Sequence, residues 1–401
     1  MTTSLSQRPL TAQYVGQIMK LHEVVPRESA GRDTINRFKA QFKAASLECL
    51  ALLENGELER IYCDYHEDYV VKHIINNNVR YRFVQVKTKQ KQNHLYSVFE
   101  VFGLKKTKAE HDLPNSFAGK LLLHIESFGA TCKSVVICTN VNFDDDVETI
   151  IKEAKIGIAT SKHTTRLINE TKKLFPSLSN KSEQEVLRFL AHLTLAPRKQ
   201  ILNEEEDNFV SLAHGKIFKY SEINLNPNEV RRIIIQLLSL IEKKSAVKLD
   251  GNITEDLLNQ KASICINDIL DILAISRQAY YILKEGGDPN AIKSVSILQR
   301  ILKRNHFSND VIEAFASFKS QWEAWFRTNR HSIPEFHLLT LNQNISKLAH
   351  QVVTSQIDMN TITPNIEQLT IRISRLLSRA DITEDLVFGA VLSEIVKGDA
   401  T

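Results

Sequence analysis

Apolar and aromatic positions dominate the stretch of residues 62–89, YCDYHEDYVVKHIINNNVRYRFVQVKTK. Valine, isoleucine, tyrosine and phenylalanine recur on both sides of three consecutive asparagines, which is typical of two β-strands joined by a short turn. An acidic cluster of Asp64, Glu67 and Asp68 opens the first predicted strand. The pattern therefore predicts a β-hairpin that carries carboxylates near one end.

The pattern elsewhere predicts mostly helices. A helix is expected from about Ile35 to Leu53, and its run AASLECLALL is apolar nearly all round, so it should be buried. Residues 116–128 form a predicted amphipathic helix that leads into SVVICT, a short apolar run consistent with a buried central strand. After Thr149 helical patterns prevail, and residues 208–223 could hold a short strand pair.

Breaks in this pattern divide the chain into three parts. Residues 1–30 are an N-terminal arm, and the segment GGDPN at 286–290 is the clearest turn late in the chain. Residues 31–285 form the predicted α/β part with a helical extension. Residues 291–401 form an all-α region of five amphipathic helices, suited to oligomerisation or partner docking. An aromatic stripe there favours core packing, with a docking face as the alternative; it consists of Phe315, Phe318, Trp322, Trp325 and Phe326.

Composition adds weaker constraints. The chain has 401 residues, of which 43% are hydrophobic and 24% charged, and a net charge of +4. These values are ordinary for a soluble globular protein and permit a local DNA-binding surface. Five cysteines without a CxxC pair indicate reduced thiols in a cytoplasmic protein. No signal-peptide pattern and no apolar run of membrane length is present, so a membrane partner is not expected.

The predicted hairpin brings chemically useful side chains together. If the turn is centred on Asn77, Asp68 lies opposite Val86, between Gln85 and Lys87, which project from one face because side chains alternate. A register shift of one residue would place Asp68 on that same face. A carboxylate, an amide oxygen and an ammonium group suit phosphodiester hydrolysis with Mg²⁺ or Mn²⁺. The alternative is an edge hairpin with a solvated acidic corner and an exposed lysine.

Other charged residues leave two interpretations open. Glu48, in the middle of the buried helix, needs either a metal ion or an arginine such as Arg80 or Arg82, because a buried carboxylate without a partner is costly. Lys89 and Lys91 follow the second strand and predict contacts with the phosphates of a DNA backbone. Solvated surface is the alternative for both lysines.

Residues 31–143 resemble the nuclease domain of the CD-NTase-associated dsDNA endonucleases of bacterial anti-phage defence. The similarity is carried by GRDTINRF, AASLECLALL, YHEDYVV, FVQVKTK and SVVICTNVNF, in the order helix, acidic strand, QxK strand, helix, strand. It implies a restriction-endonuclease-like core of the PD-(D/E)xK superfamily with helical insertions. The implied activity is metal-dependent, largely sequence-nonspecific cleavage of double-stranded DNA.

The same resemblance implies roles for individual residues. Asp68, Gln85 and Lys87 would be catalytic, with Gln85 in the place of the usual Asp or Glu. The implied metal ligands are Glu48, Asp68 and Gln85, and Glu67 would replace Asp68 if the register is shifted by one. Mg²⁺ or Mn²⁺ is the implied cofactor.

The helical C-terminal region separates this chain from family members that carry a nucleotide-sensing SAVED domain, a mixed α/β module. Its length and tail are similar to the nuclease subunit of Lamassu systems. That similarity implies an SMC-like ATPase and a small accessory subunit as partners, which hold the nuclease inactive until it is triggered, and a homo-oligomer when active. The alternatives are a nuclease subunit of a HerA-type ATPase complex, a catalytically inactive DNA-binding subunit, and a helical interaction protein.

Overall fold

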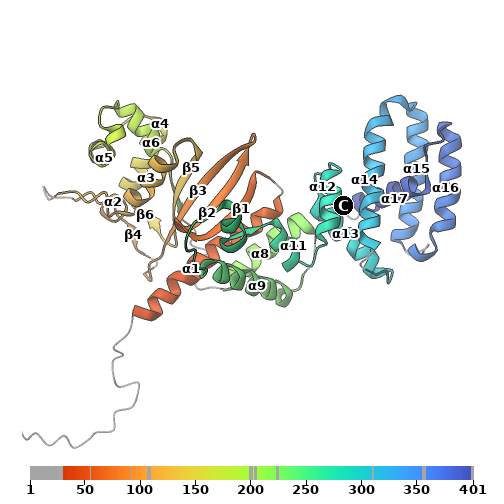
Figure 1. Ribbon diagram of the computed structural model, residues 1–401, viewed down its shortest axis with the longest axis horizontal. Helices are drawn as coiled ribbons and strands as arrows, with labels where there is room; N and C mark the ends of the chain where they lie inside the picture. The colour runs from red at the N-terminus through yellow and green to blue at the C-terminus, as the bar shows by residue number, and fades with distance from the viewer. Residues whose placement is uncertain are drawn as a thin grey trace, which may run out of the picture.

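A mixed β-sheet with helices packed against it forms one part of the protein, and the C-terminal helices lie to one side of it (Figure 1). The computed structural model describes residues 30–54, 56–91, 93–105, 110–197, 202, 206–222, 225–308, 311–354 and 358–398. The predicted N-terminal arm, residues 1–30, lies outside these ranges apart from Ala30, where the first helix begins. Within them, six strands pair in the order β7-β5-β3-β2-β1-β8. The strands are β1 Leu58–Tyr65, β2 Glu67–Ile75, β3 Asn78–Lys87, β5 Cys132–Thr139, β7 Leu193–Pro197 and β8 Ser263–Cys265. The pairs β3–β5 and β5–β7 are parallel, and the other neighbours are antiparallel.

The predicted hairpin is present as β2 and β3, and its turn is tighter than predicted. Asn76 and Asn77 have φ angles of 49° and 62°. A two-residue type I′ turn needs this left-handed backbone at both positions, and asparagine tolerates it better than most residues. The turn therefore begins at Asn76 and ends at Asn77, one residue earlier than the three-residue turn centred on Asn77 would end.

This turn shifts the register by one residue from the predicted pairing. Tyr69 pairs with Val84, and continuing that register sets Asp68 opposite Gln85 rather than opposite Val86. Residues opposite one another in an antiparallel pair point to the same face of the sheet. The alternative register is therefore the one that the structure adopts.

The sequence predicted that the acidic cluster opens one strand, and this is wrong, because the cluster is divided between two strands. Asp64 lies near the end of β1, and β2 starts at Glu67 after a reversal at His66. Asp64 and His66 have φ angles of 49° and 68°, and Tyr65 pairs with Glu67. Only one residue separates β1 from β2. The sequence pattern typical of strands therefore runs through the reversal without a break, and the reversal cannot be recognised from it.

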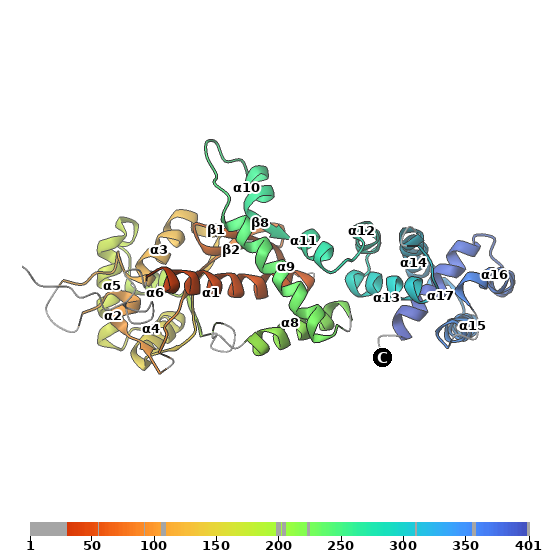
Figure 2. The ribbon, with the colours of Figure 1, turned by 90° about the horizontal axis from the view of Figure 1, so that it is seen from below.

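Helices cover both faces of the sheet. On one face, α1 (Ala30–Leu50) and the short η2 (Ala51–Glu54) pack with α8 (Glu206–Ser221) and α9 (Pro227–Ser245), as Figure 2 shows from below. On the other face, α3 (Phe117–Phe128) covers the centre of the sheet above Phe83 and Ile137. The elements around α3 are β4 Leu95–Tyr96, α2 Val98–Phe102, η3 Gly129–Thr131, β6 Asn142–Phe143, α4 Asp145–Ile156, α5 Lys162–Leu174, η4 Pro176–Leu178 and α6 Glu183–Leu190.

The strand pair predicted for residues 208–223 is wrong, because α8 occupies most of that segment. Its buried residues are Phe209, Val210, Ala213 and Ile217, which are three or four positions apart or adjacent and so share one face of a helix. Burial of that face against α1, η2, α9 and α13 (Ala291–Arg304) favours the helix over the predicted strands.

The C-terminal region is helical, as predicted. Apart from β8, the described chain after residue 254 contains only helices and their connections. Phe315 and Trp322 are buried, and the other three aromatic residues of the stripe pack half-buried against the same core, so the core interpretation is confirmed. No helix in the described residues is long and apolar enough to span a bilayer. The helices are α10 Glu255–Ala262, α11 Ile266–Ile272, α12 Arg277–Glu285, α13 Ala291–Arg304, α14 Ile312–Asn329, η6 Arg330–Ser332, α15 Glu335–Val353, η7 Met359–Thr361, α16 Thr363–Leu377 and α17 Glu384–Gly398.

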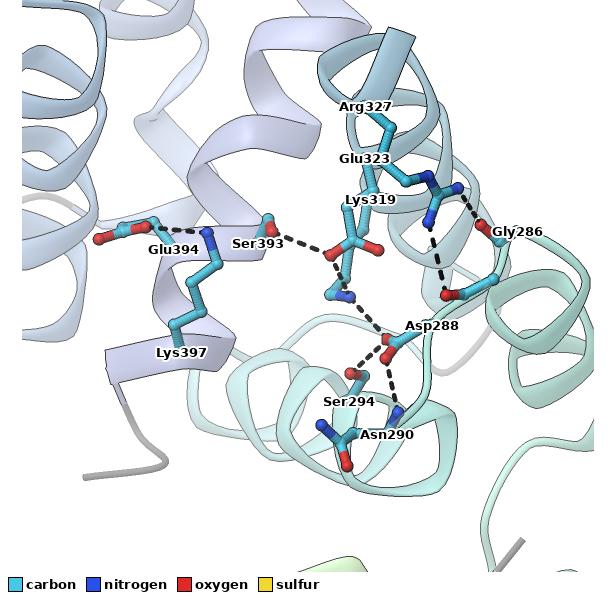
Figure 3. Close-up of polar contacts among 11 residues, drawn as sticks. Gly286, Asp288, Asn290, Ser294, Lys319, Glu323, Arg327, Ser393, Glu394 and Lys397 are labelled. Carbon is cyan, nitrogen blue, oxygen red and sulfur yellow. Dashed lines mark hydrogen bonds and ion pairs between the residues drawn. The ribbon is translucent and has the colours of Figure 1, made fainter. Parts of the chain in front are cut away.

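A buried ionic network joins the α12–α13 connection to α14 and α17 (Figure 3). Lys319 is 3% exposed, and its Nζ lies 2.7 Å from Asp288 Oδ2 and 2.7 Å from Glu323 Oε1. Ser294 Oγ donates to Asp288, and Ser393 Oγ donates to Glu323. These hydrogen bonds offset the hydration free energy that the charged groups lose on burial.

We expect the substitution Lys319→Met to lower the free energy of unfolding by about 3–5 kcal/mol, because Asp288 would keep its buried charge without a cation beside it. Urea denaturation followed by circular dichroism measures the change. Lys397→Met is the matched control, because Lys397 is exposed on α17 and its ion pair with Glu394 is long at 3.5 Å. Equal, small losses in the two variants would show that the network does not stabilise the helical region.

Candidate active site

The predicted site residues meet at one end of the sheet. Glu67 and Asp68 begin β2, and Gln85 and Lys87 lie at the end of β3. Because β2 and β3 are antiparallel, the start of one strand lies beside the end of the other. The structure thus gathers two carboxylates, one amide and one ammonium group from two adjacent strands.

Asp68 is half-buried and accepts two hydrogen bonds. Gln41 Nε2 of α1 donates to Asp68 Oδ1 at 2.7 Å, and the backbone N–H of Val86 donates to Oδ2. Burial raises the pKa of Asp68 to about 6, although the Val86 N–H and the charge of Lys87 act to lower it. A partly desolvated carboxylate of this kind gains more from a nearby cation than one in water does.

Gln85, which lies opposite Asp68 when the register of β2 and β3 is continued, has an unsatisfied side-chain oxygen. The residue is 8% exposed, and its Nε2 donates to Glu67 Oε2 at 3.2 Å. Its Oε1 is buried and has no hydrogen-bond partner among the described residues. Leaving a carbonyl oxygen buried and unpaired costs free energy, so this atom has the capacity to accept a hydrogen bond from water or to bind a cation.

Glu67 links the site to the helix on the other side of the sheet. Its Oε1 lies 2.9 Å from His124 Nε2 of α3. The His124 ring stacks on Phe83, with ring centroids 4.4 Å apart and an interplanar angle of 7°. Sequence reasoning did not single out His124; the only available signal was a polar residue between Leu122 and Ile125 on an amphipathic helix.

Lys87 lies among the other groups. Its Nζ is 5.2 Å from the centre of the Phe117 ring. Burial lowers the pKa of Lys87, the charges of Lys120 and Arg37 add to this, and the two carboxylates of β2 oppose it. Arg37 on α1 and Lys120 on α3 are exposed, so cations flank Lys87 from both helices.

Glu48, the additional metal ligand implied by the resemblance, is not brought into this group. Its carboxylate forms an ion pair with Arg82 of β3, which is the arginine alternative left open by the sequence. Gln41 lies seven residues earlier on α1, about two helical turns away, and reaches Asp68 instead. The Glu48–Arg82 pair lines a cavity of about 670 Å³ between α1, the sheet and α8.

The two lysines predicted to bind DNA differ from each other. Lys89 Nζ forms an ion pair with Glu100 Oε1 at 2.8 Å. Asn140 holds the backbone of Lys89 through bonds of 2.9 Å to its N–H and 2.8 Å to its carbonyl oxygen. Lys91 is exposed. Contacts with Asn140 and Glu100 therefore fix Lys89 just after the end of β3, and Lys91 is the more accessible of the two lysines.

The donor set at this end of the sheet fits a hard cation. No group of three or more His, Cys, Asp or Glu side chains within the described part of the chain is arranged to hold a metal ion. The oxygens available here are those of Asp68 and Glu67 and the unpaired Oε1 of Gln85. Mg²⁺ accepts carboxylate and amide oxygens and keeps several of its waters, so a site with few protein ligands suits it.

The fold and the site together define an α/β protein in which two carboxylates, an amide and a lysine lie at one end of the sheet. Residues 29–245 of the 401 match the family of the Cap4 dsDNA endonuclease domain. This match spans more than half of the chain, which therefore belongs to that family.

Several solved structures are similar to the chain at low identity. The Acinetobacter baumannii Cap4 SAVED/CARF-domain containing receptor with the cyclic trinucleotide 3′3′3′-cAAA is 12% identical, with a TM-score of 0.35, over 62% of this chain and 45% of that chain. The Moraxella osloensis Cap4 receptor is 12% identical, with a TM-score of 0.35, over 63% of this chain and 48% of that chain. The chain thus spans about half the length of these receptors. No curated protein matches it.

Proposed function

We propose that the protein is a metal-dependent endonuclease that cleaves double-stranded DNA in bacterial anti-phage or anti-plasmid defence. The observation that carries the proposal is the buried, unpaired Oε1 of Gln85 on the strand next to the Asp68 carboxylate. Membership of the Cap4 dsDNA endonuclease domain family supports the substrate class. A restriction-endonuclease-like arrangement of the PD-(D/E)xK type is part of the same proposal.

Within this proposal, Asp68 and Gln85 Oε1 hold Mg²⁺ or Mn²⁺, with Glu67 beside them. When bound, the cation supplies Lewis-acid polarisation of the scissile phosphate and a water of lowered pKa. Lys87 stabilises the negative charge that develops on the phosphate, and its partial desolvation strengthens that interaction. Glu48 is assigned to the ion pair with Arg82 and not to the cation.

DNA is proposed to lie across the end of the sheet between α1 and α3. Arg37, Lys120 and Lys91 are exposed, and the first two act electrostatically on Lys87. Cations on both sides of the centre suit contacts with backbone phosphates, which position DNA without reading its sequence.

The helical region is proposed as the part that controls the nuclease. Phe336 and Leu339 on α15 are 73% and 56% exposed, and neighbouring exposed apolar residues suit a partner protein. An SMC-like ATPase with a small accessory subunit, as in Lamassu systems, is the proposed partner, and a HerA-type ATPase is the alternative. Homo-oligomerisation of the active form would bring two centres to opposite DNA strands.

Incubation of supercoiled plasmid with the full chain and Mg²⁺ or Mn²⁺, against an EDTA control, tests the proposed activity. We expect nicked and linear products only when a divalent cation is present. The products of neighbouring genes are added in a parallel series, because the partner is part of the proposal. Salt-sensitive DNA binding without cleavage in both series would instead support a catalytically inactive DNA-binding subunit.

A further inference from the structure

The amide of Gln85 has two chemically different ends, and only one of them can bind a cation. Oε1 is an acceptor, whereas Nε2 carries two donor hydrogens. The usual Asp or Glu at such a position has two equivalent oxygens, so either one can face the site. Glutamine needs a neighbour that decides which end points inward.

Glu67 is that neighbour, because its carboxylate can only accept hydrogen bonds from Gln85. Gln85 Nε2 donates to Glu67 Oε2 at 3.2 Å, and Gln85 Oε1 is the end left buried and unpaired. Rotating the amide by half a turn would set its oxygen against the carboxylate and its NH₂ toward the site. The first contact would be repulsive, and the second would repel a cation.

His124 holds Glu67 in the position that this requires. His124 Nε2 and Glu67 Oε1 are 2.9 Å apart, and both side chains are largely buried, at 14% and 10% exposed. The His124 ring is itself fixed by stacking on Phe83, two residues before Gln85 on the same strand. The chain of contacts therefore starts and ends on β3, and a shift of α3 against the sheet would break it.

We propose that His124 is a positioning residue, which acts through Glu67 to keep the oxygen end of the Gln85 amide facing the metal site. This inference rests on the proposed function of that site. Residues that orient metal ligands through hydrogen bonds typically change metal affinity by about 10–100-fold when they are removed. This effect should disappear when Gln85 is replaced by glutamate, because the two oxygens of a carboxylate are equivalent.

A double-mutant cycle measured by Mn²⁺ binding tests the inference. The electron paramagnetic resonance signal of free Mn²⁺ is titrated with wild type, H124A, Q85E and the double variant H124A/Q85E. We expect H124A to weaken Mn²⁺ binding by about 10–100-fold in the wild-type background and much less in the Q85E background. His124→Gln, which retains an N–H donor, is expected to recover most of the lost affinity and guards against a folding defect in H124A.

The outcomes separate this inference from the proposed function. Equal losses from H124A in both backgrounds, within about twofold, would overturn the positioning role and leave the metal site standing. No loss from H124A in the wild-type background would also overturn it. A wild-type protein that does not bind Mn²⁺ at millimolar concentration would overturn the proposed metal site, and this inference with it.

Discussion

Plasmid cleavage by the variant Lys87→Ala is expected to be slower than wild-type cleavage by about 10²–10³-fold. Lys87 is the cation beside the carboxylates of β2, and its charge is partly shielded from water. Alanine removes the group that stabilises the charge developing on the phosphate, so the loss should fall on the rate of the chemical step. The initial rate of loss of supercoiled plasmid at saturating Mg²⁺ measures it.

Lys397→Ala is the control for this experiment, because Lys397 is an exposed lysine on α17, far along the chain from the site. It should cleave at the wild-type rate. Circular dichroism should show that both variants fold. If Lys87→Ala cleaved within about threefold of Lys397→Ala, far short of the expected loss, Lys87 would not be a catalytic residue.

The second large effect is expected for Asp68→Asn, which should abolish metal-dependent cleavage and at the same time stabilise the fold at neutral pH. The pKa of Asp68 is about 6 in the folded protein against an ordinary value of 3.8. The folded state therefore holds this proton more tightly than the unfolded state, and stability falls as the pH rises from about 4 to 6. Above pH 6 the ionised carboxylate costs on the order of 2–3 kcal/mol, which asparagine does not incur.

Urea denaturation of both proteins at pH 4 and pH 7.5 measures this difference. Asp68→Asn should gain stability relative to wild type as the pH rises, because other titrating groups are common to both proteins. Gln41 can accommodate the change by turning its amide, so that its oxygen accepts from the new NH₂ group while the Val86 N–H keeps its acceptor. A stability difference that is constant or reversed with pH would show that Asp68 carries no buried charge.

The local parts of the fold could be predicted from the sequence. The hairpin and the QxK strand follow from alternation and an asparagine turn, and these depend only on neighbouring residues. Three consecutive asparagines allow turns that differ by one residue, so the register could be stated only with its alternative. The observed turn at Asn76 and Asn77 decides between them.

The contacts that complete the site could not be predicted, because they join distant segments. Gln41 lies 27 positions before Asp68, and His124 lies 57 positions after Glu67. Nothing in the local pattern around either residue indicates its partner. The choice between Arg82 and a cation for Glu48 depended in the same way on how α1 lies across the sheet. The edge strands β7 and β8 are short and become recognisable only through their pairing.

The location of a bound cation is the most direct test of the proposed metal site, and it does not depend on any activating partner. Crystals soaked in MnCl₂ would be measured near the manganese absorption edge, and an anomalous difference map would show the ion. We expect a peak at roughly 2.0–2.3 Å from Gln85 Oε1 and from a carboxylate oxygen of Asp68. A well-occupied Mn²⁺ elsewhere in the molecule, with Gln85 Oε1 still unpaired, would contradict it.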